Sequence, residues 1–199
     1  MPKATPKLVL ASASPRRQEL LAQIDIFPDR IEPADIDETP HANESPRTYV
    51  RRMAEEKGRS AAMRNPGDLV LAADTVVALG RRILGKPATR DEAERYLRLL
   101  SGRRHQVLTA VVLISPKDGK PACRTSASTV RFLRLGDDAI TRYLETMEWQ
   151  GKAGGYAIQG QAARFIDFIS GSYSGIVGLP LAETARLLEG AGYRPTRPD

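Results

Sequence analysis

The sequence has one cysteine, two histidines and no long apolar run, and each scarcity excludes a class of protein. Cys123 stands alone, so an intrachain disulfide is impossible and a reducing, cytoplasmic setting is expected. His41 and His105 lie far apart and match no zinc-ligand spacing. No apolar run approaches the roughly 20 residues of a membrane-spanning helix. The apolar stretch after the basic residues 1–7 is also too short for a signal peptide.

Several catalytic patterns are missing as well. The glycine-rich stretch 151–155 lacks the spacing Gly-x-x-x-x-Gly-Lys-Ser/Thr, which disfavours a P-loop NTPase. Ser172 and Ser174 lack the Gly-x-Ser-x-Gly context that places a hydrolase nucleophile on a sharp turn. Cys123 has no histidine close to it in the sequence, so a catalytic thiol is not expected.

Positive charge is present in excess but is not concentrated. The net charge is +6, and a basic balance suits nucleic acid, an acidic membrane surface or a polyanionic small molecule. Arginine pairs occur at 51–52, 81–82 and 103–104, yet no long basic tract does. A well-solvated surface is therefore the better explanation for most of these residues.

Strand-like and helix-like stretches alternate along the chain, which predicts an α/β fold. We expect one domain over residues 1–199, with its core at about 8–190 and short flexible ends. Residues 28–44 are expected to be mainly loop. The predicted strands are 8–11, 69–73, 76–79 paired with 83–84 as a hairpin, 107–114, 126–135 and 165–169. The predicted helices begin at Pro15, Pro46, Arg90, Asp137 and Pro180.

The segment from Ser12 to Arg17 joins an apolar strand to a helix and is the most informative local feature. Ser14 is placed to cap the helix, with Pro15 at its first position, where the missing N–H costs nothing. Arg16 and Arg17 then lie in the first turn, where the helix dipole is already positive. A phosphate would satisfy the free N–H groups and both guanidiniums together. The alternative is a capped surface helix with two solvated arginines.

Asp74 and Thr75 follow the predicted strand 69–73. A carboxylate at the end of a buried strand lies where open α/β sheets place their ligands. There it can hold a divalent metal or accept a proton from water that attacks phosphorus. The alternative is an aspartate that only caps the following turn, and position in the sequence does not distinguish the two.

Four further polar residues become informative only in combination. Glu38 lies in an acidic run that can supply a metal ligand from a loop. Lys57 and Lys86 can each pair with a phosphate as a point charge. The amide of Gln159 can both donate to and accept from a nucleobase. Taken alone, Glu38 and each lysine are better explained by solvated positions, and Gln159 supports no assignment.

Together these motifs resemble the Maf family of nucleotide pyrophosphatases. The resemblance spans roughly Leu8 to Leu188, and several ordered motifs at family-like spacing are more specific than any one alone. Many members carry Glu before the Lys-Pro pair, whereas this chain has Gly85, which removes a carboxylate from beside Lys86. The matching segments are 10–17, Glu38, 55–57, 73–77, 85–87, 100–102, 152–160, 171–173 and 177–180.

The resemblance implies both a fold and a reaction. The implied fold is a curved mixed β-sheet flanked by helices, with two lobes around a cleft, distantly related to the inosine triphosphate pyrophosphatases. The implied reaction converts a nucleoside triphosphate and water into the monophosphate and pyrophosphate. It uses a divalent metal cation, Mg²⁺ or Mn²⁺, and the family suggests a homodimer.

The resemblance also implies a role for each matching polar residue. Asp74 is the expected proton acceptor for water and, with Glu38, the expected metal ligand, while Lys86 belongs to the same catalytic set. A triphosphate carries about four negative charges at neutral pH, which the basic residues and the metal would offset. The residues expected to bind the substrate are Ser12, Arg16, Arg17, Lys57, Thr75 and Gln159.

Branches of the family differ at three places. The branch acting on 7-methyl-GTP usually has Tyr-Arg-Arg, Asp-Gln and a Glu-Gly pair. This chain instead resembles the branch acting on dTTP and UTP, through 15–17 (Pro-Arg-Arg), 74–75 (Asp-Thr) and 158–160 (Ile-Gln-Gly). Arg16, Thr75 and Gln159 therefore imply a pyrimidine substrate, with CTP or modified pyrimidine nucleotides as further candidates in a house-cleaning role.

Two other functions stay open at this point. A nucleic-acid-binding or septum-formation regulatory protein without catalysis fits the basic charge, although no recognition helix, zinc finger or aromatic RNA-binding motif supports it. A phosphomonoesterase with Asp74 as its nucleophile would release orthophosphate. The Asp-x-Asp-x-Thr pattern of such enzymes does not surround Asp74.

Overall fold

The computed structural model describes residues 6–117 and 119–194, so the expected flexible ends lie mostly outside the described residues. The elements in chain order are β1 (Leu8–Leu10), α1 (Pro15–Ala22), β2 (Arg30–Ile31), α2 (Pro46–Arg64), β3 (Leu69–Leu79), β4 (Arg82–Leu84), α3 (Arg90–Leu100), β5 (Arg104–Ile114), β6 (Pro121–Phe132), α4 (Asp137–Glu145), the 3₁₀ turns η1 (Ala153–Gly155) and η2 (Gln161–Phe165), β7 (Ile166–Ser170), α5 (Tyr173–Val177) and α6 (Leu181–Gly190).

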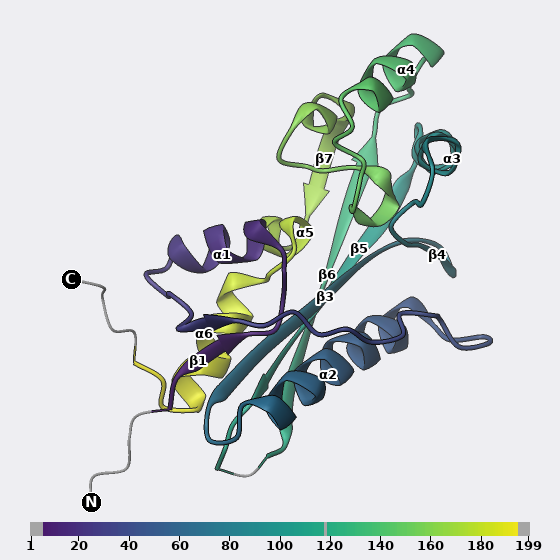
Figure 1. Ribbon diagram of the computed structural model, residues 1–199. Coiled ribbons are helices and arrows are strands. Elements are labelled where there is room, and N and C mark those ends of the chain that lie inside the picture. Colours follow the sequence, from purple (N-terminus) through teal and green to yellow (C-terminus); the bar gives the residue numbers. More distant parts are fainter. Residues whose placement is uncertain (1–5, 118, 195–199) are drawn as a thin grey trace, which may run out of the picture.

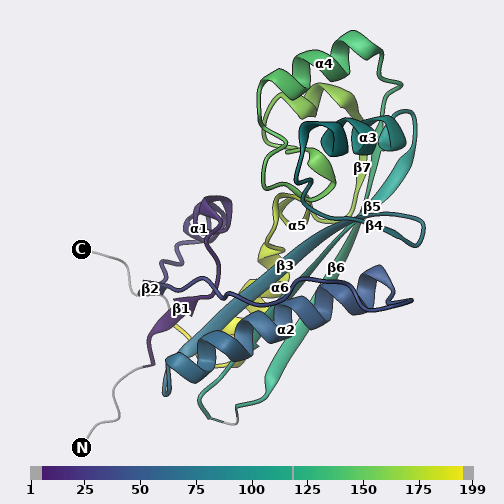
Figure 2. The same ribbon diagram turned by 45° about the vertical axis from the view of Figure 1, so that its right-hand side comes forward.

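The strands form one seven-stranded mixed sheet in the order β2-β1-β3-β5-β6-β7, with β4 paired to β3. β1 is parallel to β2 and β3, and the other pairs are antiparallel. The long strands β3, β5 and β6 connect two groups of elements. α1, β1, α2 and α6 lie toward one end, and α3, α4 and β7 lie toward the other (Figures 1 and 2). The predicted α/β class, a mixed sheet flanked by helices, is confirmed.

Each face of the sheet covers its own apolar core, because successive side chains of a strand point to opposite faces. On β3, Leu69, Leu71 and Ala73 belong to the core shared with α1, α3, α4 and α6. Val70 and Ala72 belong to the core covered by α2. This alternation decides which way the polar residues that follow on the same strand will point.

The helix starts follow local chemistry. At α2, the side chain of Ser45 accepts a hydrogen bond from the Thr48 N–H and Pro46 occupies the first turn, as predicted. At α1, Ser14 holds the cap position, but its side chain makes no capping hydrogen bond, so that part of the prediction is wrong. The Ser14 N–H instead donates to the Ser12 hydroxyl, 3.2 Å away. The first turn of α1 therefore has no side-chain cap of its own.

The predicted break after residue 73 is also wrong. β3 runs without interruption through Asp74 and Thr75 to Leu79, because β5 pairs with it from Val70 to Ala78. Asp74 therefore lies in the middle of a strand and not at its end. The predicted hairpin between the end of β3 and 83–84 is confirmed as β3–β4.

Besides the 3₁₀ turns η1 and η2, a short strand and a short α-helix were not anticipated. β2 occupies two residues of the expected loop 28–44, and α5 occupies 173–177, where no helix was predicted. Both are shorter than the window over which hydrophobic periodicity is informative. Their positions depend on contacts with β1 and with β5 and β6.

Candidate active site

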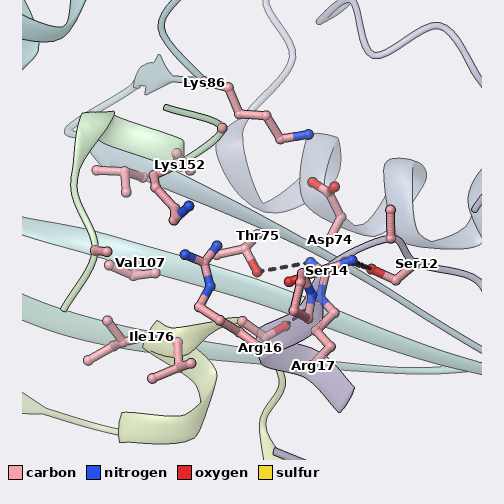
Figure 3. A pocket seen from close by; sticks show the side chains of 18 of the residues that line it. Ser12, Ser14, Arg16, Arg17, Asp74, Thr75, Lys86, Val107, Lys152 and Ile176 are labelled. Atoms are coloured by element: carbon pink, nitrogen blue, oxygen red, sulfur yellow. Dashed lines mark hydrogen bonds between the residues drawn. The ribbon is translucent and has the colours of Figure 1, made fainter. Parts of the chain in front are cut away.

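One edge of β3 pairs first with β1 and further along with β4, and a cleft lies between these two pairings at Asp74 and Thr75. β1 pairs with β3 up to Leu71, and β4 pairs with it from Val77 onward. Between these two contacts no strand of the described chain covers this edge. A cleft of about 490 Å³ lies there and reaches both faces of the sheet. Asp74 points toward α2, whereas Thr75 points to the opposite face, beside Arg17 (Figure 3).

On the α2 side, the structure brings together four residues that the sequence placed far apart. Lys57 Nζ donates to Asp74 Oδ1 at 2.6 Å and contacts Glu38 Oε1 at 2.7 Å. Lys86 Nζ lies 3.2 Å from Glu38 Oε2. Lys57 and Asp74 are only 7% and 6% exposed. A charged lysine this deeply buried requires charged partners, and two carboxylates provide them.

The charge state of Glu38 follows from this arrangement. Burial alone would raise the pKa of Glu38, but the hydrogen bond and charge of Lys57, with Lys86 adding to them, hold it below its ordinary value. Glu38 is therefore an anion at neutral pH. Two carboxylates and two ammonium groups consequently face one side of the cleft.

The loop that carries Glu38 is fastened to α2. Tyr49 Oη donates to the Glu38 carbonyl at 2.9 Å. Arg52 forms a two-point ion pair with Glu44, at 2.8 and 2.7 Å, and also donates to the Thr39 carbonyl at 3.1 Å. The hydrogen bond from Arg52 lowers the pKa of Glu44 to about 2. These contacts hold Glu38 at the cleft, and no sequence motif predicted them.

On the opposite side, Arg17 joins three parts of the site. Its Nε donates to the Gly178 carbonyl at 2.9 Å, and its terminal nitrogens donate to Ser12 Oγ at 2.8 Å and Thr75 Oγ1 at 3.4 Å. Burial lowers the pKa of Arg17, while the charge of Asp74 opposes that change. Each terminal nitrogen carries a second N–H, so Arg17 can still donate to a ligand.

Arg16 has no such internal role. Its Nε is buried and has no hydrogen-bond partner among the described residues. Burial also lowers the pKa of Arg16. Because an unpaired buried N–H is costly, this atom marks a place where a ligand would be favourable. Arg16 and Lys152 lie on one side of Thr75 and Asp74 on the other (Figure 3).

The loop 152–160 closes the remaining wall and carries Gln159, which is exposed at the cleft. The Gly154 N–H donates to the Gly85 carbonyl at 2.9 Å, which ties this loop to the turn that carries Lys86. Gly154 has a φ of 70°, and a Cβ there would lie 2.8 Å from Val77. Only glycine therefore lets the loop pack so closely on β3.

The letters Asp-x-Asp-x-Thr do occur once, at residues 35–39. Asp37 Oδ1 accepts from the Thr39 N–H at 2.9 Å, as in an ordinary polar turn. Of these five residues, Glu38 alone is among those that line the cleft. The segment thus does not present an aspartate nucleophile to the cleft.

His105, expected to be structural or at the surface, lies directly behind the cleft wall. Its Nε2 is 2.7 Å from the hydroxyl of Tyr156, which lines the cleft, and its ring packs edge-on against Phe132. His105 is 3% exposed. Burial lowers the pKa of this imidazole to about 4, so it is neutral at pH 7.

This burial predicts an acid-sensitive fold. The unfolded chain binds a proton at His105 near pH 6.5, so the stabilising contribution is complete above that pH and is lost as the pH falls toward 4. The loss should amount to about 3 kcal/mol. Denaturant unfolding at pH 7 and pH 4.5 measures it, and His105→Gln should show a smaller difference. An equal pH dependence in the two proteins would contradict this role.

Among residues 6–117 and 119–194, no group of three or more His, Cys, Asp or Glu side chains gathers in a way that could hold a metal ion. Within that part of the chain there is also no helix long and apolar enough to cross a membrane.

Comparison with known proteins identifies the family. The family model described as Maf-like protein matches residues 7–191. The chain belongs to the Maf family. The resemblance indicated by the sequence motifs is thus confirmed over nearly the whole chain.

Curated relatives of this Maf protein match over almost their full length. It is 57% identical over 192 residues to the dTTP/UTP pyrophosphatase of Caulobacter vibrioides, covering 96% of this chain and 99% of that protein. It is 55% identical over 190 residues to the dTTP/UTP pyrophosphatase of Rhodospirillum rubrum, covering 96% and 90%. Among solved structures, the Staphylococcus aureus Ham1 protein is similar with a TM-score of 0.49 and 14% identity, covering 92% of this chain and 98% of that chain.

Proposed function

We propose that the protein hydrolyses dTTP and UTP between the α- and β-phosphates, giving the nucleoside monophosphate and pyrophosphate. The names of its curated relatives support this substrate class. The observation that carries the proposal is the buried contact of Lys57 with Asp74 and Glu38 inside the cleft. It places a carboxylate base among cations that can offset a polyphosphate. A regulatory protein without catalysis has no need of such a cluster.

In this proposal Asp74 accepts the proton of the attacking water. Its Oδ1 already accepts from Lys57 at 2.6 Å, which fixes the carboxylate and leaves the other oxygen for water. The water oxygen forms a bond to the α-phosphorus while the bond from that phosphorus to the bridging oxygen breaks. Pyrophosphate leaves with the electrons of that bond, and the proton passes to Asp74.

The basic residues hold the phosphates during this step. Lys86 and Lys57 face the cleft on the α2 side, and Arg16, with its unpaired Nε, and Arg17 face it on the other. Ser12 contributes a hydroxyl that already orients Arg17. Cations on both walls would stabilise the charge that develops on the departing pyrophosphate.

The carboxylates also fit a divalent metal. Mg²⁺ is commonly held by one or two carboxylates together with substrate phosphates and water, which agrees with the lack of a larger acidic cluster in the described chain. Asp74 and Glu38, which both contact Lys57, would hold the metal. Mg²⁺ or Mn²⁺ would offset phosphate charge when bound. Gly85 adds no carboxylate to this set.

Arg16, Thr75 and Gln159 are the residues we propose to select a pyrimidine base. All three line the same cleft, and Thr75 points away from the face that carries Asp74. We further propose that residues 1–199 act as one domain with its core at about 8–190, that the protein is a cytoplasmic homodimer, and that it binds no specific nucleic acid.

A substrate panel tests the proposal. With Mg²⁺ or Mn²⁺, the purified protein should release pyrophosphate from dTTP and UTP at least about tenfold faster than from ATP or GTP. EDTA should stop the reaction, and added metal should restore it. Orthophosphate as the product would indicate a phosphomonoesterase instead. No turnover of any nucleotide, together with tight and salt-sensitive DNA binding, would favour the regulatory alternative.

A further inference from the structure

Behind Thr75 lies a short chain of hydrogen bonds that the proposed reaction does not use. Thr75 Oγ1 lies 3.0 Å from Thr109 Oγ1, and Thr109 Oγ1 lies 2.7 Å from the Gly175 carbonyl oxygen. Thr109 is 1% exposed and does not line the cleft. It therefore acts on a ligand only through Thr75.

The Gly175 carbonyl determines which hydroxyl donates in each of these hydrogen bonds. A carbonyl oxygen can only accept, so Thr109 must donate its single hydroxyl proton to Gly175. Thr109 can then only accept at its contact with Thr75, which uses the single proton of Thr75. Arg17 also donates toward Thr75 Oγ1, at 3.4 Å. Thr75 is left with one lone pair, and no proton, to offer the cleft.

The carbonyl that sets this direction is itself held in place. The Gly175 N–H donates to Ser172 Oγ at 3.0 Å, and Ser128 Oγ exchanges hydrogen bonds with the backbone of Ser172. The Gly178 carbonyl of the same segment accepts from Arg17 Nε at 2.9 Å. The segment that contains α5 thus has a structural role in the site.

We propose that Thr109 is a positioning residue that fixes Thr75 as a hydrogen-bond acceptor, and that Thr75 takes a hydrogen bond from the N3–H of uracil or thymine. The inference rests on the proposed function for its substrate class. Asp74 and Thr75 point to opposite faces of β3, so a group bound at Thr75 lies on the other face of the strand from the carboxylate that takes the proton. Cytosine has a lone pair at N3, which would face the remaining lone pair of Thr75.

Besides N3–H, dTTP and UTP share a second hydrogen-bond donor, the 3′-hydroxyl. Analogues that lack one donor or the other show which of them binds Thr75. For the wild-type protein we expect kcat/KM for N3-methyl-UTP to fall at least about tenfold below that for UTP, the worth of one hydrogen bond at such a site. 3′-Deoxy-UTP should stay within about twofold of UTP. A loss with the 3′-deoxy analogue alone would overturn the N3 assignment. No loss with either analogue would overturn the acceptor role.

Two variants test Thr109 itself. Thr109→Val removes the hydroxyl and frees the Thr75 proton, so the ratio of kcat/KM for UTP to that for CTP should fall about tenfold. Thr109→Ser keeps the hydroxyl and should retain the wild-type ratio. A merely structural role would lower the melting temperature and the rates for both nucleotides while leaving the ratio unchanged. An unchanged ratio in folded Thr109→Val would overturn the proposal.

The dissociation constants for UTP and CTP, measured in EDTA, report the preference between the two nucleotides without turnover. If the wild-type protein binds UTP over CTP, loses this preference in Thr109→Val, and yet hydrolyses neither, the proposed function fails and the role of Thr109 stands. If hydrolysis is confirmed but binding and turnover show no dependence on Thr109, the proposed function stands and this inference fails.

Discussion

Replacing Asp74 with asparagine should lower kcat for pyrophosphate release from dTTP about 1,000-fold, the usual contribution of a general base. Asparagine has the same shape, and its carbonyl oxygen can still accept the hydrogen bond that Lys57 donates at 2.6 Å. It has no basic oxygen to take a proton from water. Binding of the nucleotide should change much less than turnover, because the cationic walls of the cleft remain.

Steady-state kinetics with a coupled pyrophosphate assay measures this effect, and thermal unfolding checks that the variant is folded. Asp167→Asn is a matched control, since Asp167 pairs with Arg131 outside the cleft lining. The control should keep wild-type activity. A folded Asp74→Asn protein with near-normal kcat would remove Asp74 from the catalytic role.

Replacing Lys57 with methionine should lower the free energy of unfolding by about 3 kcal/mol and the activity more than about 100-fold. Lys57 is buried between Asp74 and Glu38. Its removal takes the ion-pair partner away from buried Asp74 and leaves Glu38 paired with Lys86 alone, and breaking a buried ion pair from one side is costly. The activity falls as well because the catalytic carboxylate loses both its orientation and a neighbouring cation.

The double variant Lys57→Met/Asp74→Asn separates stability from catalysis. Neutralising Asp74 should recover most of the lost unfolding free energy, since fewer unpaired charges remain, while activity stays absent. Denaturant unfolding of the four proteins gives the coupling energy between the two residues. Lys117→Met, at an exposed lysine, serves as the control. A Lys57→Met protein as stable as wild type would contradict the buried ion-pair account.

Local signals predicted the elements that depend on local chemistry. The Ser45-Pro46 start of α2 and its apolar face, which includes Tyr49 and Met53, are as expected. The position of Asp74 was not predictable in the same way. Its place in the middle of β3 depends on how far β5 pairs along that strand and on where β1 ends and β4 begins. These are long-range pairings that no short window of sequence contains.

In the site, too, residues in local motifs were predicted, whereas residues that act through long-range contacts were not. Charged residues in recognisable motifs, such as Glu38, Lys57 and Lys86, were identified from the sequence, and the structure brings them together. The residues behind them were missed. Thr109 is one hydroxyl within an otherwise apolar stretch of β5, and its position in a buried strand was the only available signal. Arg52 was one arginine among many, and its anchoring role requires knowing where the loop 32–45 lies.

Hydrolysis of dTTP in water enriched in oxygen-18 tests the central claim most directly. Attack at the α-phosphorus, with Asp74 taking the proton, places the heavy oxygen in dTMP and leaves pyrophosphate unlabelled. Mass spectrometry of the two products distinguishes the outcomes. Label in dTMP alone is the predicted result. Label in pyrophosphate, or release of labelled orthophosphate with dTDP, would contradict it.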